Sequence, residues 1–216
     1  MRTFELLIAV APIAMYLVLL GLINLRRRPY VLTGTRESLL VGLALAGLVV
    51  VGPIELFFPQ QAANRFGHYV WPLLAMFYTL LLCLWILLGR PRLIVYNVSS
   101  AQLRAVLSEA AIKLDADARW AGDSLALPQM NVQLHLEVFD WMRNVTLVST
   151  GGDQSYTNWR RLEGALRVAL REITVPRNPR GYSFILVGLM LIATLAIQAA
   201  RNPQAIAQGL IDFLRL

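Results

Sequence analysis

The sequence predicts an α-helical integral membrane protein with four transmembrane helices and a small cytosolic α+β insert between the third and the fourth. Three observations lead to this fold class. Hydrophobic residues make up 57% of the chain and charged residues 15%, against roughly 45–50% and about 25% in soluble domains. The apolar residues gather into four long runs. Between the last two runs the pattern changes to strand and helix periodicity.

The four apolar runs cover residues 6–25, 39–58, 70–88 and 181–200. A bilayer core about 30 Å thick needs about 20 helical residues, so each run is long enough to span. The first run is too long for the apolar part of a signal peptide and is followed by three arginines. We therefore expect three spans within 1–90, an insert at 91–176, a fourth span within 177–200 and a tail at 201–216.

The positions of the arginines predict the orientation, because loops rich in Lys and Arg stay in the cytoplasm. The expected loop 26–36 carries four arginines, whereas the loop 59–69 carries one. Two further pairs flank the insert: Arg90 with Arg92, and Arg177 with Arg180. We expect the amino terminus outside, the insert in the cytoplasm and the carboxyl terminus outside. Of the 20 basic residues all but Lys113 are arginine, which suggests a bacterial chain and hence the inner membrane.

The insert opens with an expected strand at 93–98 and continues into a helix. Ser99 with Gln102 three residues later forms a capping-box pattern, which predicts the helix start. The apolar residues that follow share one helix face. They are Leu103, Val106, Leu107, Ala110, Ala111 and Leu114.

The rest of the insert predicts an antiparallel sheet and a second helix. Gly122-Asp123 predicts a hairpin turn between short arms at 118–121 and 125–127. Apolar and polar residues alternate at 132–138, which predicts a half-buried strand, and a turn at 140–144 leads to a strand at 145–150. One apolar face on each element predicts two helices on one face of an antiparallel sheet, in the order βαβββα, or βαββα if the hairpin merges.

The second insert helix carries a candidate binding surface. At 100° per residue, Arg160, Gly164, Arg167 and Arg171 fall within about 60° on the side opposite the apolar stripe. Such arginines near a membrane can bind anionic headgroups or an acidic partner protein. The alternative is a solvated helix face, balanced by neighbouring glutamates.

Glu55 is the only charged residue within the four runs, and an ionisable residue in a membrane is a functional candidate. It can form a proton or cation site with His68. The alternative is a carboxylate that reaches headgroup water or pairs with Arg65.

Small residues recur every four positions in the second run, at Ser38, Gly42 and Ala46. They favour close helix packing, against another span of this chain or against a second subunit. The tail is expected to form a short amphipathic helix on the membrane surface or on a partner.

Other features argue against catalysis, metals and nucleic acid. Cys83 is the single cysteine, and no catalytic triad order or phosphate-binding glycine loop is present, so we expect no metal site and no cofactor. The insert has 12 basic and 9 acidic residues from 90 to 180 and no RNA-binding aromatic pattern, so no nucleic acid is expected. Trp120, Trp141 and Trp159 are expected in the core, and His135 on the polar face of a strand.

These features predict a non-enzymatic, multi-pass membrane protein that serves as an accessory or scaffold subunit of a larger complex. Its partners would be membrane lipids, other protein subunits and possible further copies of the chain. Two alternatives stay open. One is a small oligomeric transport or ion-conducting protein that uses Glu55, and the other is a sensor of anionic lipid that uses Arg160, Arg167 and Arg171.

Overall fold

The computed structural model describes residues 3–54, 69–152 and 155–215. The chain divides into two compact units, and each unit is assembled from separate stretches of sequence. The helical unit contains Met1–Gly21, Ser38–Leu88 and Ser183–Leu216. The sheet unit contains Leu22–Glu37 and Gly89–Tyr182. Glu55, His68 and Arg65 lie outside the described residues.

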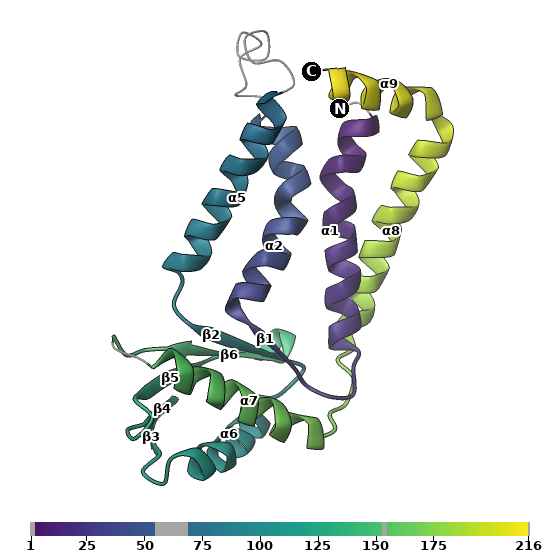
Figure 1. The fold of residues 1–216 in the computed structure, drawn as a ribbon. Coiled ribbons are helices and arrows are strands. Elements are labelled where there is room, and N and C mark those ends of the chain that lie inside the picture. Colours follow the sequence, from purple (N-terminus) through teal and green to yellow (C-terminus); the bar gives the residue numbers. More distant parts are fainter. Residues whose placement is uncertain (1–2, 55–68, 153–154, 216) are drawn as a thin grey trace. The chain divides into compact units, whose positions relative to one another are not determined.

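Four long apolar helices are described: α1 (Thr3–Asn24), α2 (Gly34–Val49), α5 (Val70–Leu88) and α8 (Arg180–Arg201) (Figure 1). A π-helical turn, η1 (Val50–Ile54), continues α2. Among the described residues, three helices are long and apolar enough to cross a membrane, at Thr3–Asn24, Gly34–Gly52 and Arg180–Arg201. The fourth, counted over Pro72–Leu88, is shorter. The apolar helices are thus compatible with a membrane protein; three of them are candidate spans within the described residues, and the predicted fourth span is not confirmed.

Glycines mark the crossings between the helices of the helical unit, where α5, α2, α1 and α8 lie side by side in that order (Figure 1). A Cβ at Gly42 of α2 would lie 2.7 Å from the side chain of Leu82 in α5. A Cβ at Gly47 would collide with the carbonyl oxygen of Ile8 in α1, and one at Gly188 of α8 would lie 2.7 Å from Val18. Backbones that approach this closely are typical of helix packing within membranes.

The tail forms a separate helix, α9 (Pro203–Arg215), after the break at Asn202. The helical pattern expected for this tail is thus present. Gly209 of α9 lies against Phe4 near the start of α1, where an added Cβ would be 2.5 Å from the Cβ of Phe4. At this position the tail helix packs on the first helix of the same chain.

The sheet unit contains an antiparallel sheet with the strand order β1-β2-β6-β5-β4-β3. The strands are β1 (Tyr30–Thr33), β2 (Arg92–Tyr96), β3 (Arg119–Ala121), β4 (Ser124–Leu127), β5 (Val132–Phe139) and β6 (Asn144–Ser149). Both arms of the predicted hairpin are strands. The insert therefore has the order βαββββα, with one strand more than predicted.

Strand β1 is the main difference from the sequence prediction, which treated 26–36 as a loop. Its residues pair with β2 from Tyr30 opposite Tyr96 to Thr33 opposite Leu93. The side chain of Val31 joins the core. Residues YVLT suit a strand because they are aromatic or β-branched with one exception. The pairing was missed because the partner strand lies more than 50 residues away along the chain.

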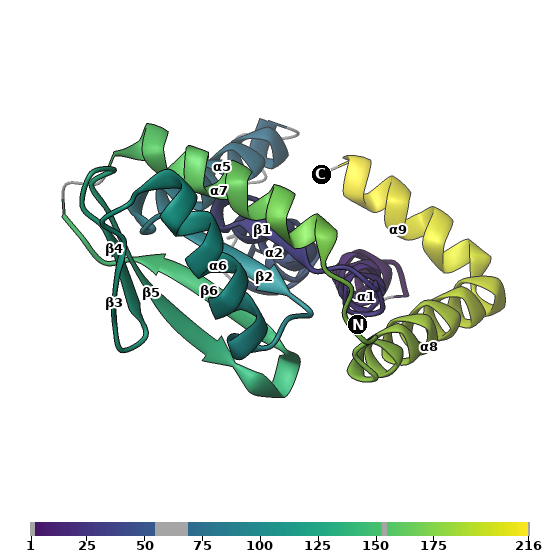
Figure 2. The ribbon, with the colours of Figure 1, turned by 90° about the horizontal axis from the view of Figure 1, so that it is seen from below.

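Helices α6 (Ser100–Leu114) and α7 (Tyr156–Glu172) cover one face of the sheet (Figure 2). The predicted capping box at Ser99 and Gln102 is confirmed, with both hydrogen bonds at 3.3 Å. The core between helices and sheet is made of leucine and valine with a few other residues. It includes Leu93, Val95, Leu103, Leu107, Leu125, Leu127, Leu134, Leu147, Trp159, Leu162, Leu166 and Leu170.

Three buried asparagines, which we call the asparagine cluster, fasten the connecting segments of the sheet unit. They are Asn24, Asn97 and Asn178, with exposed fractions of 0%, 0% and 2%. Asn97 has a left-handed backbone with φ of 58° and donates from Nδ2 to the carbonyl of Arg26 at 2.6 Å. Asn178 donates from Nδ2 to Oδ1 of Asn24 at 3.3 Å. The end of α1 and the start of α8 thus join the sheet unit through buried polar contacts.

Candidate docking surface on helix α7

Helix α7 has one buried face and one solvent face. Ser155 caps its start, where its hydroxyl accepts a hydrogen bond from the backbone N–H of Asn158 at 3.4 Å. Trp159, Leu162, Leu166 and Leu170 are buried against the sheet. Because their spacing is that of a helix stripe, the residues halfway around the helix face solvent.

The exposed side carries the surface that we call the α7 basic face, made of Arg160, Arg161, Gly164, Val168 and Arg171. All five residues are exposed, and Val168 keeps 60% of its accessible surface. A Cβ on Gly164 would meet nothing within 4 Å. The exposed side of α7 thus combines three arginines with a glycine and a valine.

The predicted arginines do not all have the same role. Arg160 and Arg171 are exposed as expected. Arg167 is half-buried and its Nη2 lies 2.7 Å from Oε1 of Glu163, one turn earlier. The Nε of Arg167 is buried without a hydrogen-bond partner among the described residues. The sequence prediction did not include Arg161, whose exposure follows from its position three residues before Gly164.

Charge in the chain is concentrated in the sheet unit. Its two stretches hold 16 of the 20 basic residues and 10 acidic residues, a net charge of +6. On α6, Glu109 accepts a hydrogen bond from Lys113 at 2.9 Å, and this contact raises the pKa of that lysine above its ordinary value. The sheet unit therefore carries most of the positive charge of the chain.

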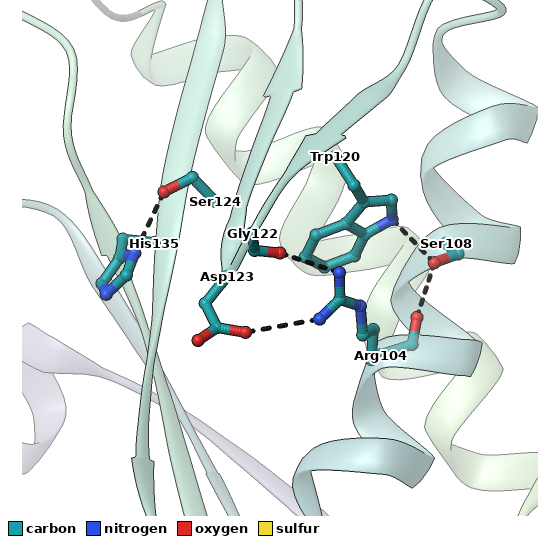
Figure 3. Close-up of polar contacts among 7 residues, drawn as sticks. All are labelled: Arg104, Ser108, Trp120, Gly122, Asp123, Ser124 and His135. Carbon is teal, nitrogen blue, oxygen red and sulfur yellow. Dashed lines mark hydrogen bonds and ion pairs between the residues drawn. The ribbon is translucent and has the colours of Figure 1, made fainter.

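A second group of polar contacts, around Arg104 of α6, has a structural role (Figure 3). The guanidinium of Arg104 stacks 4.5 Å from the ring centre of Trp120 and donates to the carbonyl of Gly122 at 2.7 Å. It also pairs with Asp123 at 3.3 Å. Trp120 in turn donates from Nε1 to Ser108 at 2.8 Å. We call these residues the hairpin clip, because they hold the β3–β4 hairpin against α6.

The hairpin turn has the geometry that its sequence predicts. Gly122 has φ of 61°, and Ala121 pairs with Ser124 on either side of the two-residue loop. A positive φ at the first central position is typical of type II′ turns and favours glycine. This turn places Asp123 within reach of Arg104.

Ser124 and His135 form a hydrogen-bonded pair across neighbouring strands, with Oγ 3.0 Å from Nδ1 (Figure 3). The two residues are directly opposite each other in the register of β4 and β5. No carboxylate hydrogen-bonds to His135 among the residues that the structure describes. The pair thus matches a cross-strand polar contact, and His135 lies half-buried on the strand.

The small residues singled out in the second run lie along α2. Ser38 is buried, with an exposed fraction of 8%, and Ala46 is partly buried. Gly42 lies against Leu82 of α5, and its carbonyl accepts a hydrogen bond from the hydroxyl of Tyr78 at 2.6 Å. The helix that approaches Gly42 therefore belongs to the same chain.

Neither a metal-ligand cluster in the described residues nor a similarity to known proteins indicates a function. In the described part of the chain, no three His, Cys, Asp or Glu side chains come together as metal ligands. Comparison of the chain with protein-family models, with curated proteins and with solved structures finds no match. The exposed surfaces of the chain are therefore the features from which a function can be inferred.

Proposed function

We propose that this chain is a non-enzymatic, multi-pass protein of a bacterial inner membrane, and that it serves as an accessory or scaffold subunit whose sheet unit docks a partner protein. In this proposal the protein crosses the membrane four times, and α5 is the third of the four spans. The concentration of 16 basic residues in the sheet unit supports a cytoplasmic position for that unit, because Lys and Arg next to spans stay in the cytoplasm. Both chain termini then lie outside.

The observation that carries the docking proposal is the α7 basic face. Arg160, Arg161 and Arg171 are exposed around Gly164 and Val168, while the opposite side of α7 supplies the core. Arginine is enriched among the residues that contribute most to protein interfaces, and charge complementarity speeds and orients association. A partner that fits this face has carboxylates around a small apolar contact.

The test is affinity purification of the full chain in mild detergent, followed by size analysis. We expect a protein to copurify with the unchanged chain and to be lost when Arg160, Arg161 and Arg171 are each replaced by Glu. Arg119→Glu is the matched control, because Arg119 is an exposed arginine on the edge strand β3. A lone monomer, or retention of the partner by the triple variant, would contradict the proposal. Size analysis also detects a homo-oligomer.

The two alternatives have tests of their own. If the α7 basic face binds anionic lipid instead, the triple variant loses affinity for phosphatidylglycerol vesicles, and added salt weakens binding by the unchanged chain. Transport would rest on Glu55, and flux in proteoliposomes compared between Glu55→Gln and the unchanged chain tests it. Equal flux, or no flux in either, removes that alternative.

A further inference from the structure

The turn between β5 and β6 exposes two large aromatic side chains. It consists of the short 3-10 helix η3 (Asp140–Met142), preceded by Phe139 and followed by Arg143. Phe139 and Trp141 each keep 62% of their accessible surface. The expectation that Trp141 belongs to the core is therefore wrong, whereas Trp159 is buried and Trp120 packs against the core. The reason is that η3 projects Trp141 away from the sheet.

Three contacts within the sheet unit hold this turn beside the start of α8. The guanidinium of Arg180 lies 4.6 Å from the ring centre of Trp141. Asn178 donates from Nδ2 to the carbonyl of Met142 at 2.9 Å, and Arg143 donates from Nη1 to the carbonyl of Pro176 at 3.3 Å. The aromatic turn is thus fastened at the residue where a candidate span begins.

The position of Arg180 indicates the level of the membrane surface. It is the first residue of α8, whose range Arg180–Arg201 is long and apolar enough to cross a membrane. Tryptophan is enriched where the hydrocarbon core meets the headgroups, and an indole ring there prefers one apolar and one hydrated side. Arg177 is exposed in the segment just before α8 and adds positive charge at the same level.

We propose that Phe139 and Trp141 insert into the headgroup region of the leaflet on the side of the sheet unit, where Arg177 and Arg180 bind lipid phosphates. The partner is the lipid surface. Positive charge favours anionic lipid there, and the exposed aromatic rings leave water when they enter it. Asp140, which lies between Phe139 and Trp141 in the sequence, is exposed and remains hydrated in this arrangement. This inference rests on α8 crossing the membrane, and it does not require a protein partner.

Spin labels on the full chain in nanodiscs test the insertion. The background is Cys83→Ser, which removes the single cysteine, and the nanodiscs contain phosphatidylcholine and phosphatidylglycerol. A nitroxide at Trp141→Cys is expected to be less accessible to a water-soluble nickel complex, and more accessible to oxygen, than a nitroxide at a position in water. The matched control is Ala105→Cys, an exposed position on α6, which is expected to stay fully open to nickel.

A third label separates this inference from the membrane assignment. Leu189 of α8 is 52% exposed, and a label at Leu189→Cys reports whether α8 lies in lipid. If the label at position 189 lies in lipid and the label at position 141 is exposed to water, the insertion of Trp141 is overturned while α8 remains a span. Water-exposed labels at both positions overturn the assignment of α8 as a span, and with it the inference. Phe139→Cys repeats the measurement in case the change at Trp141 disturbs the contact with Arg180.

Discussion

Asn178 donates a hydrogen bond from Nδ2 to Oδ1 of Asn24 at 3.3 Å, and the two residues are 154 positions apart in the sequence. The backbone N–H of Asn178 also donates to the carbonyl of Asn24 at 3.1 Å. Asn24 is the last residue of α1, and Asn178 lies two residues before α8. One buried contact therefore joins segments from the two ends of the chain.

Replacing Asn178 by Ala is expected to destabilise the chain. The change removes the donor for Asn24 and for the carbonyl of Met142, and an unpaired buried polar group costs about 1–3 kcal/mol. Thermal unfolding in detergent measures the loss. Asn202→Ala is the control because Asn202 is exposed between α8 and α9. Equal midpoints for the two variants would contradict the structural role of Asn178.

Strand β1 is expected to be necessary for a stable sheet unit. Thr33 lies opposite Leu93, so a short Gly-Ser linker can join residues 26–34 to residues 91–176 as a hairpin. This joined chain should unfold at a higher temperature than 91–176 alone, because burial of Val31 contributes about 1.5–3 kcal/mol. Circular dichroism follows the unfolding. The joined chain with Val31→Ser is the control, and it should lose most of the gain.

The hairpin clip is expected to hold β3 and β4 in place. Arg104→Met removes the ion pair with Asp123 and the hydrogen bond to Gly122; we expect a loss of about 1 kcal/mol. Hydrogen exchange at residues 119–127 should become faster. Lys113→Met on the same helix is the control, because its ion pair with Glu109 is exposed to solvent and such surface pairs contribute little to stability. Unchanged exchange in Arg104→Met would show that the clip is dispensable.

Two glycine substitutions are expected to have opposite effects. Gly47→Ala should destabilise the helical unit, since the new Cβ would collide with the backbone of Ile8. Gly164→Ala should stabilise α7 by about 0.5–1 kcal/mol, because its Cβ enters open space and alanine favours helix. Thermal unfolding of both variants in detergent provides the comparison. A stabilising shift for Gly47→Ala would argue against the crossing of α1 and α2 at Gly47, and a destabilising shift for Gly164→Ala would argue against open space at Gly164.

Local patterns predicted much of the sheet unit. The capping box at Ser99, the stripes of α6 and α7 and the turn at Gly122 depend on residues within a few positions of each other. Their structures follow the predictions closely. Arg160 and Arg171 were also placed on the exposed side of α7, since helix geometry relates them directly to the buried leucines.

Contacts between distant residues explain what the patterns missed. Residues 30–33 carry too short a signal to predict a strand, and only pairing with β2 makes them one. Arg167 belongs to the same stripe as Arg160, but it forms an ion pair with Glu163 and lies half-buried. Trp141 is a large aromatic residue of the kind expected in a core. It is exposed because it lies in a turn, which is held in place by contacts with Asn178 and Arg180.

Composition and periodicity were thus sufficient for the apolar helices and for the two amphipathic helices, because these patterns arise from burial along a single element. The edge strand β1, the hairpin clip and the asparagine cluster needed the folded chain. Each depends on polar or backbone groups separated in sequence, and such groups pair only after the apolar core has brought them together.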